Sequence, residues 1–101
     1  MNIMRGDAYP IKFKVKTEDG VVITSEMASE VEIIINGIRK LYSSGEVTYS
    51  EQYWFFPMSQ QESYAMPEFG RWQVRVKQGD EVIGEDGGSV YMIESQSKAV
   101  L

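Results

Sequence analysis

The side chains best suited to chemistry in this chain are four aromatic rings, at Tyr49, Tyr53, Trp54 and Trp72. Aromatic rings on one face of a small β-sheet stack on sugars or cover an extended peptide. Alternation along a strand places Tyr53 on one face and Trp54 on the other, so one of these faces is expected to meet solvent or a partner. Tyr49, Tyr53 and Trp54 are therefore the candidate partner-binding residues. The competing interpretation buries Trp72, together with Trp54 or Phe55, in a core.

The densest acidic group holds Asp80, Glu81, Glu85 and Asp86. Carboxylate oxygens are calcium ligands, but the EF-hand spacing with its terminal glutamate is missing. We interpret the group as a solvated hairpin end, whose charges also discourage strand addition at a sheet edge. The sequence therefore predicts no metal site and no cofactor.

Catalytic groups are scarce, because the chain contains no histidine and no cysteine. This composition removes the usual general base at neutral pH, the commonest metal ligand and any thiolate nucleophile. No serine stands in a Ser-x-x-Lys arrangement, and a chain of this length is too short to build a glycosidase cleft. We expect a protein that is not an enzyme. The tripeptide Arg5-Gly6-Asp7 is interpreted as a turn ahead of a strand rather than as an integrin motif.

Length and composition indicate a single globular domain over residues 1–101. The chain is 43% hydrophobic and 25% charged, as ordinary globular domains are. A net charge of −5 disfavours nucleic acid and anionic membrane surfaces as partners. The first residues lack the apolar run of a signal peptide, and no window approaches the length of a membrane span. Residues 95–101 are expected to form a flexible tail.

The elements that must position these residues are short strands separated by turns. The dipeptide Asn36-Gly37 lies between two apolar runs, which is the strongest short signal for a β-hairpin. A second hairpin is predicted at Gly79-Asp80, after a run in which Trp72, Val74 and Val76 alternate with polar residues. The runs with strand character cover residues 9–16, 21–23, 31–35, 38–42, 47–49, 52–57, 63–66, 71–77, 82–83 and 89–94, and roughly seven to nine strands are expected from them.

The connections between these strands are also predicted. Residues 24–30 fit either a single helical turn or a loop, and residues 59–62 form a polar corner. Residues 86–88 turn the chain into its last strand, where Val90 and Met92 point inward and Ile93 is a third candidate for the core. Seven to nine short, mainly antiparallel strands with this turn spacing predict an all-β sandwich or a small barrel.

Four segments, taken in order along the chain, resemble small proteins encoded by tailed phages and prophages of Gram-positive bacteria. Residues 56–63 are similar to a recurring Leu-Thr-Gln-Glu-Glu-Thr segment of that family. Met58 and Ser63 depart from it, since the family more often has Leu and Thr there. The resemblance also covers residues 5–15 with the turn at 19–20, residues 70–77, and residues 97–101.

The resemblance implies an immunoglobulin-like β-sandwich, similar to the amino-terminal domains of upper baseplate proteins. It further implies a virion structural or assembly module of the baseplate, tail or head. The expected partners are other virion or assembly proteins, or a second copy of this chain. The expected location is the host bacterial cytoplasm during assembly and then the virion. The alternative function is a small carbohydrate- or peptide-binding module that uses an exposed aromatic face.

Overall fold

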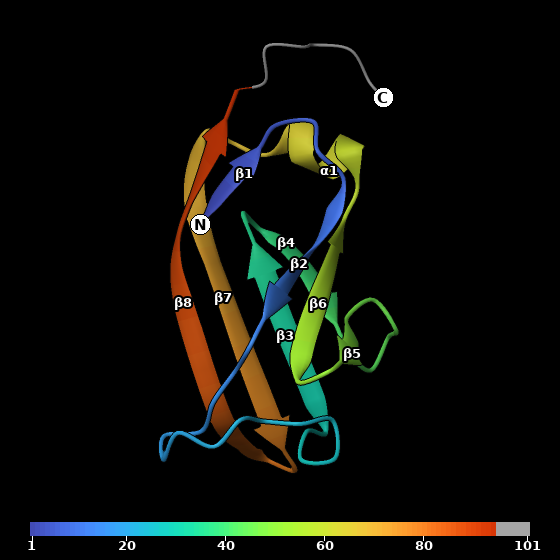
Figure 1. The fold of residues 1–101 in the computed structure, drawn as a ribbon, viewed down its shortest axis with the longest axis vertical. Helices are drawn as coiled ribbons and strands as arrows, with labels where there is room; N and C mark the ends of the chain where they lie inside the picture. Colours follow the sequence, from blue (N-terminus) through green and yellow to red (C-terminus); the bar gives the residue numbers. More distant parts are fainter. Residues whose placement is uncertain (95–101) are drawn as a thin grey trace.

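The structure is a computed structural model that describes residues 1–94, so the predicted tail at 95–101 lies outside the described residues. Within these residues, one helix and eight strands follow one another (Figure 1). In order they are β1 (Asn2–Met4), β2 (Tyr9–Phe13), β3 (Glu30–Ile35), β4 (Ile38–Leu41), β5 (Thr48–Ser50), β6 (Tyr53–Met58), α1 (Gln60–Ala65), β7 (Phe69–Gln78) and β8 (Glu81–Ile93).

These strands form two sheets, which confirms the all-β prediction. A five-stranded sheet has the order β1-β8-β7-β3-β4, and a three-stranded sheet has the order β2-β6-β5. Every pairing is antiparallel except that of β1 with β8, which is parallel and makes the larger sheet mixed. Figure 1 shows β2 and β6 running in front of β3 and β4, with the long β7–β8 hairpin beside them.

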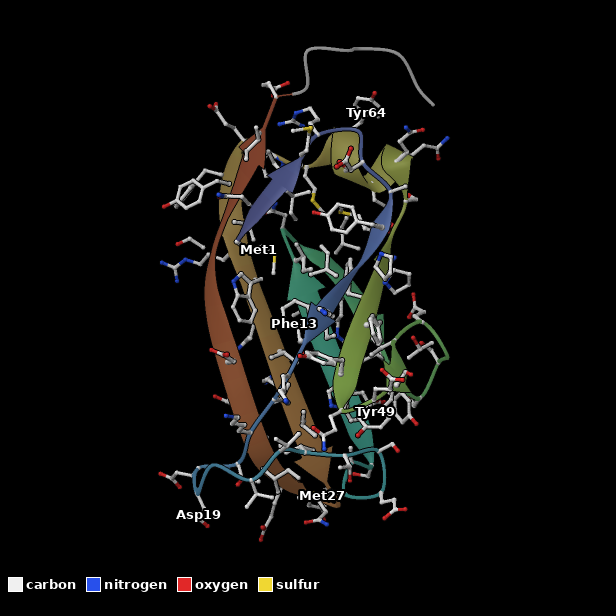
Figure 2. The ribbon with its side chains drawn as sticks, viewed as in Figure 1. Met1, Phe13, Asp19, Met27, Tyr49 and Tyr64 are labelled. Carbon is white, nitrogen blue, oxygen red and sulfur yellow. The ribbon has the colours of Figure 1, made fainter. Side chains whose placement is uncertain are left out.

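The core lies between the two sheets, and alternation along the strands selects its members. Val74 and Val76 of β7 are buried, as predicted, whereas Trp72 is only partly buried at the margin. Phe13 of β2 is buried in this core (Figure 2), and its ring centroid lies 5.1 Å from that of Trp72. Each aliphatic side chain removed from water in this way contributes about 1.5 to 3 kcal/mol. The remaining core is drawn mainly from β3 and β6, as Val31, Ile33, Ile35, Trp54, Phe56 and Met58.

Both predicted hairpins are confirmed. Asn36 and Gly37 adopt φ angles of 49° and 85°, the left-handed pair that a type I′ turn requires between β3 and β4. Gly79 adopts φ 61° at the turn between β7 and β8. The residues between β2 and β3 form a loop, whose one ladder contact is an isolated bridge between Lys16 and Val22.

The predicted strand at 63–66 is wrong, because residues 63–65 belong to helix α1 and Met66 is its C-cap. The Ser59 hydroxyl accepts a hydrogen bond from the Glu62 backbone N–H at 3.0 Å. The Glu62 carboxylate accepts one in return from the Ser59 backbone N–H at 2.9 Å. This reciprocal capping box satisfies two N–H groups that a helix start leaves unpaired, and it favours the helix over a strand.

The predicted turn at 86–88 is also wrong, because β8 continues without a break from Glu81 to Ile93. Gly88 pairs with Trp72 of β7, and a Cβ at Gly88 would lie 2.7 Å from the indole Nε1. The glycine therefore makes room for the indole to lie against the strand. Ile93 is exposed rather than inward, since strict alternation from Val90 and Met92 sends it to the other face.

The junction after β1 is tied to helix α1. The Arg5 guanidinium donates to the backbone carbonyls of Tyr64 and Met66, at 3.0 and 2.6 Å. Gly6, with φ 93°, donates its N–H to the Ser63 hydroxyl at 2.8 Å, and Ser63 is fully buried. Two members of the Arg-Gly-Asp tripeptide are therefore engaged inside the molecule, and the turn that they form closes this end of the fold.

Candidate functional site

The predicted partner-binding residue Trp54 belongs to the core. Its side chain is 0% exposed, and its indole Nε1 donates to the Ile23 carbonyl at 3.3 Å. The rings of Tyr42 and Tyr49 pack on it, with centroids 4.9 and 4.6 Å away. The assignment of Trp54 to a partner-facing surface is therefore corrected. The prediction took the face of β6 that carries Trp54 as the one that meets a partner, but β6 turns Trp54 and Phe56 toward the larger sheet.

Tyr49 and Tyr53 are both half-buried, but they lie on opposite faces of the small sheet. Tyr49 pairs with Trp54 across β5 and β6 and shares its inward face, whereas Tyr53 lies on the outer face. Lys12 Nζ lies 4.7 Å from the centroid of the Tyr53 ring, and Lys14 Nζ lies 5.4 Å from it. Two ammonium groups thus occupy the space around this ring in cation–π contacts. Figure 2 shows Tyr49 beside β5, at the edge of the same sheet. Within residues 1–94, Tyr49, Tyr53 and Trp54 do not build a platform of three open rings.

An exposed apolar surface exists elsewhere, on the outer face of the five-stranded sheet. Its members are Met4 of β1, Phe69 of β7, and Tyr91 and Ile93 of β8, with exposed fractions between 42% and 58%. The sheet register places Phe69 opposite Tyr91 and Met4 opposite Ile93, so the four lie on three neighbouring strands. The Phe69 and Tyr91 rings are in contact, with centroids 5.2 Å apart. We call these four residues the apolar patch.

A shallow groove of about 900 Å³ continues from the apolar patch along the same sheet. Phe69 and Pro67 are among its lining residues, and Arg71, Gln73 and Glu85 add charged and polar groups. The Asn36 side chain lies directly over Gly70, where a Cβ would fall 1.5 Å from its Oδ1. The patch and the groove together offer both apolar and hydrogen-bonding contacts to a protein partner.

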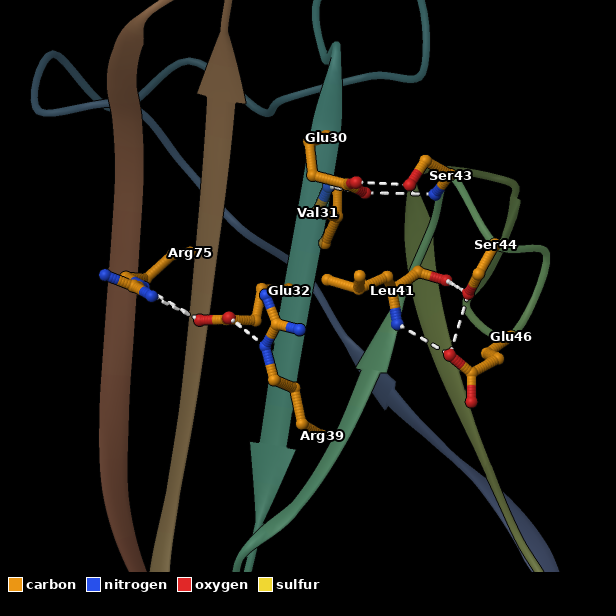
Figure 3. A network of polar contacts seen from close by, with 9 residues as sticks. All are labelled: Glu30, Val31, Glu32, Arg39, Leu41, Ser43, Ser44, Glu46 and Arg75. Carbon is orange, nitrogen blue, oxygen red and sulfur yellow. Dashed lines mark hydrogen bonds and ion pairs between the residues drawn. The ribbon is translucent and has the colours of Figure 1, made fainter.

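Beyond the groove, the outer face is fixed by a charge network centred on Glu32 of β3 (Figure 3). The Arg75 Nε and the Arg39 Nε donate to its two carboxylate oxygens at 2.9 and 2.5 Å. Burial alone would raise the pKa of the Glu32 carboxyl, but the hydrogen bonds from Arg39 and Arg75 outweigh it and lower the pKa below its usual value. One carboxylate thus links β4, β3 and β7 across the sheet.

A second part of the network holds the loop after β4. The Glu30 carboxylate accepts hydrogen bonds from the Ser43 hydroxyl and from its backbone N–H, the latter at 3.0 Å. Ser44 donates its hydroxyl to the Glu46 carboxylate at 2.7 Å. Burial raises the pKa of Glu30, but the hydrogen bonds from Ser43 prevail and lower it. This part of the face is therefore held by hydrogen bonds between its own polar groups.

The described residues contain neither a cluster of metal-ligating side chains nor a helix that could span a membrane. Among residues 1–94, no three acidic, histidine or cysteine side chains converge as a metal site would require. The one described helix, α1, is six residues long, and no helix in this part of the chain has the length and apolar character to cross a bilayer.

Searches against protein-family profiles, characterised proteins and solved structures find no match to this chain. The apolar patch therefore rests on its own geometry. Sequence reasoning missed it because its members are spread from residue 4 to residue 93 and meet only through the pairing of β8 with β1 and with β7. The one available signal was alternation: Val90 and Met92 inward imply Tyr91 and Ile93 outward.

Proposed function

We propose that this protein is a non-catalytic structural or assembly module of a phage or prophage virion that acts through protein–protein contacts. The observation that carries the contact role is the apolar patch of Met4, Phe69, Tyr91 and Ile93. Neighbouring large apolar side chains with roughly half of their surface in water usually mark a binding surface. The virion setting rests on the resemblance of residues 5–15, 56–63 and 70–77 to phage proteins.

We propose further that the fold is immunoglobulin-like. If the eight strands are lettered A, B, C, C′, D, E, F and G in chain order, the sheets contain B-E-D and G-F-C-C′. These are the neighbours that strands of those letters have in immunoglobulin domains. The first strand departs from that plan, since β1 pairs with β8 in the larger sheet rather than with β2. The buried tryptophan also lies on β6 instead of on the strand lettered C.

Such a module fits the charge of the chain and its apolar patch. A net charge of −5 keeps separate copies soluble before assembly, since like-charged molecules repel one another at long range. Contact with a partner then removes the apolar patch from water. The aromatic pair Phe69 and Tyr91 supplies the side-chain types most often found at the energetic centre of interfaces.

The test uses the double variant Phe69→Ser and Tyr91→Ser in the organism that carries the gene. Prophage is induced, particles are purified by density gradient, and the ratio of this chain to the major capsid protein is measured by mass spectrometry. We expect a fixed ratio for the native chain and a loss of at least tenfold for the variant. The matched control is Val21→Ser with Val82→Ser, which removes two equally exposed apolar side chains outside the patch.

Two results would contradict the proposal. Absence of the native chain from purified particles would remove the virion role. Equal incorporation of the native chain and the Phe69/Tyr91 variant would remove the apolar patch as the contact surface. Thermal unfolding of each purified variant accompanies the test, so that a folding defect is recognised as such.

A further inference from the structure

The middle of β8 is an open sheet edge. β7 covers one side of β8 along nearly all of its length, whereas β1 covers the other side only at residues 91–93. Glu85, Asp86, Gly87 and Gly88 are four consecutive exposed residues, and within residues 1–94 no strand pairs with them on the side away from β7. An exposed edge of this kind is a template for an added strand.

The register identifies which backbone groups face the open side. The Met1 nitrogen donates to the Ser89 carbonyl at 2.9 Å, and the Tyr91 N–H donates to the Met1 carbonyl at 2.9 Å. Ser89 and Tyr91 therefore turn their backbone groups away from β7. Since the direction alternates along a strand, Glu85 and Gly87 turn theirs the same way. These two residues offer the hydrogen-bonding groups that an added strand would use.

The Asp86 carboxylate occupies a backbone donor of this edge. Its Oδ1 accepts the Gly87 N–H at 2.8 Å, which satisfies an edge donor while no strand is present. No cation lies within ion-pair distance of Asp86 among the described residues. An incoming cation can draw the carboxylate away from the Gly87 N–H and release that group for strand pairing. An acidic segment would instead be repelled.

The two glycines leave room beside the edge. Gly88 has no side chain between the edge and the Trp72 indole, which is itself only partly buried. Gly87 lines the groove that leads to the apolar patch. A strand laid along β8 can therefore place one apolar side chain against Trp72. Such a strand would also lie next to the apolar patch.

We propose that the β8 edge at residues 85–88 binds an extended, lysine- or arginine-bearing segment of a partner protein by strand addition. The proposal rests on the proposed contact function and names the chemistry of the partner. Charge selects this occupant over a second copy of the chain, because pairing two β8 edges would bring Glu85 and Asp86 of each copy together, with no cation beside either Asp86.

The test is nuclear magnetic resonance titration of the isotope-labelled full chain with two synthetic nonapeptides. One peptide alternates lysine with valine and threonine, and its twin has glutamate at every lysine position. We expect the basic peptide to shift the Glu85 and Gly87 amide signals and to slow their hydrogen exchange. We also expect it to bind at least tenfold more tightly than its twin, with an advantage that shrinks as salt is added.

The decisive variant is Asp86→Lys, with Asp19→Lys as the matched control. Both make the same charge change at an exposed aspartate, and Asp19 lies in the loop at the far end from α1 (Figure 2). We expect Asp86→Lys to abolish the preference for the basic peptide and Asp19→Lys to retain it. Three results for the native chain would overturn the proposal. These are equal binding of the two peptides, no shift of the amide signals at millimolar peptide, or shifts of amide signals scattered away from β8.

Two other outcomes separate the hypotheses. If the Glu85 and Gly87 signals change with protein concentration alone while the mass doubles, the edge pairs with a second copy and the basic-segment proposal is wrong. If the apolar patch is needed for particle incorporation but the peptides do not bind, the contact function stands and the edge proposal falls. If the basic peptide binds but the chain is absent from particles, the edge stands and the virion role falls.

Discussion

At the scale of single residues, the outer face of the five-stranded sheet depends on Glu32. The Glu32 side chain is 10% exposed, and its carboxylate lies between two guanidinium groups that remain partly in water. Removing such a carboxylate loses charge-assisted hydrogen bonds but leaves both cations hydrated. The consequence is a moderate effect on stability with a distinctive dependence on pH.

We predict that Glu32→Gln lowers the free energy of unfolding by about 1 kcal/mol at pH 7. The folded-state pKa of Glu32 lies below its ordinary value of 4.5, so its contribution is complete above pH 4.5 and is lost as pH falls through the lower value. Urea unfolding at pH 7 and at pH 3 should therefore show a smaller difference for the variant than for the native chain. Glu18→Gln, at an exposed carboxylate, is the control; an unchanged pH difference in Glu32→Gln would refute the assignment.

The residue scale also shows why the aromatic prediction failed. Alternation correctly separated Tyr53 and Phe55 from Trp54 and Phe56, but a single strand does not reveal which of its faces meets the second sheet. That choice is made by the partner strands β2 and β5 and by the loop that brings the Ile23 carbonyl to the Trp54 indole.

At the scale of elements, helix α1 joins the small sheet to the large one. Its six residues are too few to be helical alone, so capping and tertiary contacts must hold it. Lys40 of β4 supplies one such contact through an ion pair with Glu62, at 3.0 Å. The same Glu62 closes the capping box, which couples the start of the helix to the edge of the larger sheet.

We predict that Ser59→Ala lowers the free energy of unfolding by about 1 kcal/mol, because the Glu62 N–H loses its acceptor. Urea unfolding followed by circular dichroism measures the change. An unaltered slope of the unfolding free energy against urea concentration indicates that the fold is kept. Ser50→Ala, at an exposed strand serine, should change stability by less than about 0.5 kcal/mol. Equal effects of the two substitutions would show that the capping box does not stabilise the protein.

Elements also show which parts of the fold a sequence can reveal. Asn36-Gly37 specified its hairpin, because the turn conformation is local and few residues adopt it. Helix α1 was also locally encoded, by the Ser-x-x-Glu pattern at 59–62, and was overlooked. By contrast, the local sequence does not predict β1 or the unbroken course of β8. Three residues carry no strand period, and Gly87-Gly88 reads as a turn until Trp72 is placed against it.

At the scale of the whole molecule, the two sheets are unequal. The five-stranded sheet extends beyond the three-stranded one, and its outer face bears the charge network, the groove and the apolar patch. The candidate surface is therefore a property of strand order. None of its residues is distinctive in the sequence, and it exists because β1 places Met4 next to Ile93.

The position of Met1 has a practical consequence for protein engineering. β1 runs parallel to β8, so residues fused ahead of Met1 would continue backward past Ser89 toward Gly87, along the open edge (Figure 2). An affinity tag at the amino terminus would then act as a tethered competitor at high local concentration. We predict that such a tag weakens binding of the basic nonapeptide at least fivefold, measured by titration, whereas the same tag after residue 101 does not. The choice of fusion end thus decides whether a binding screen sees this edge at all.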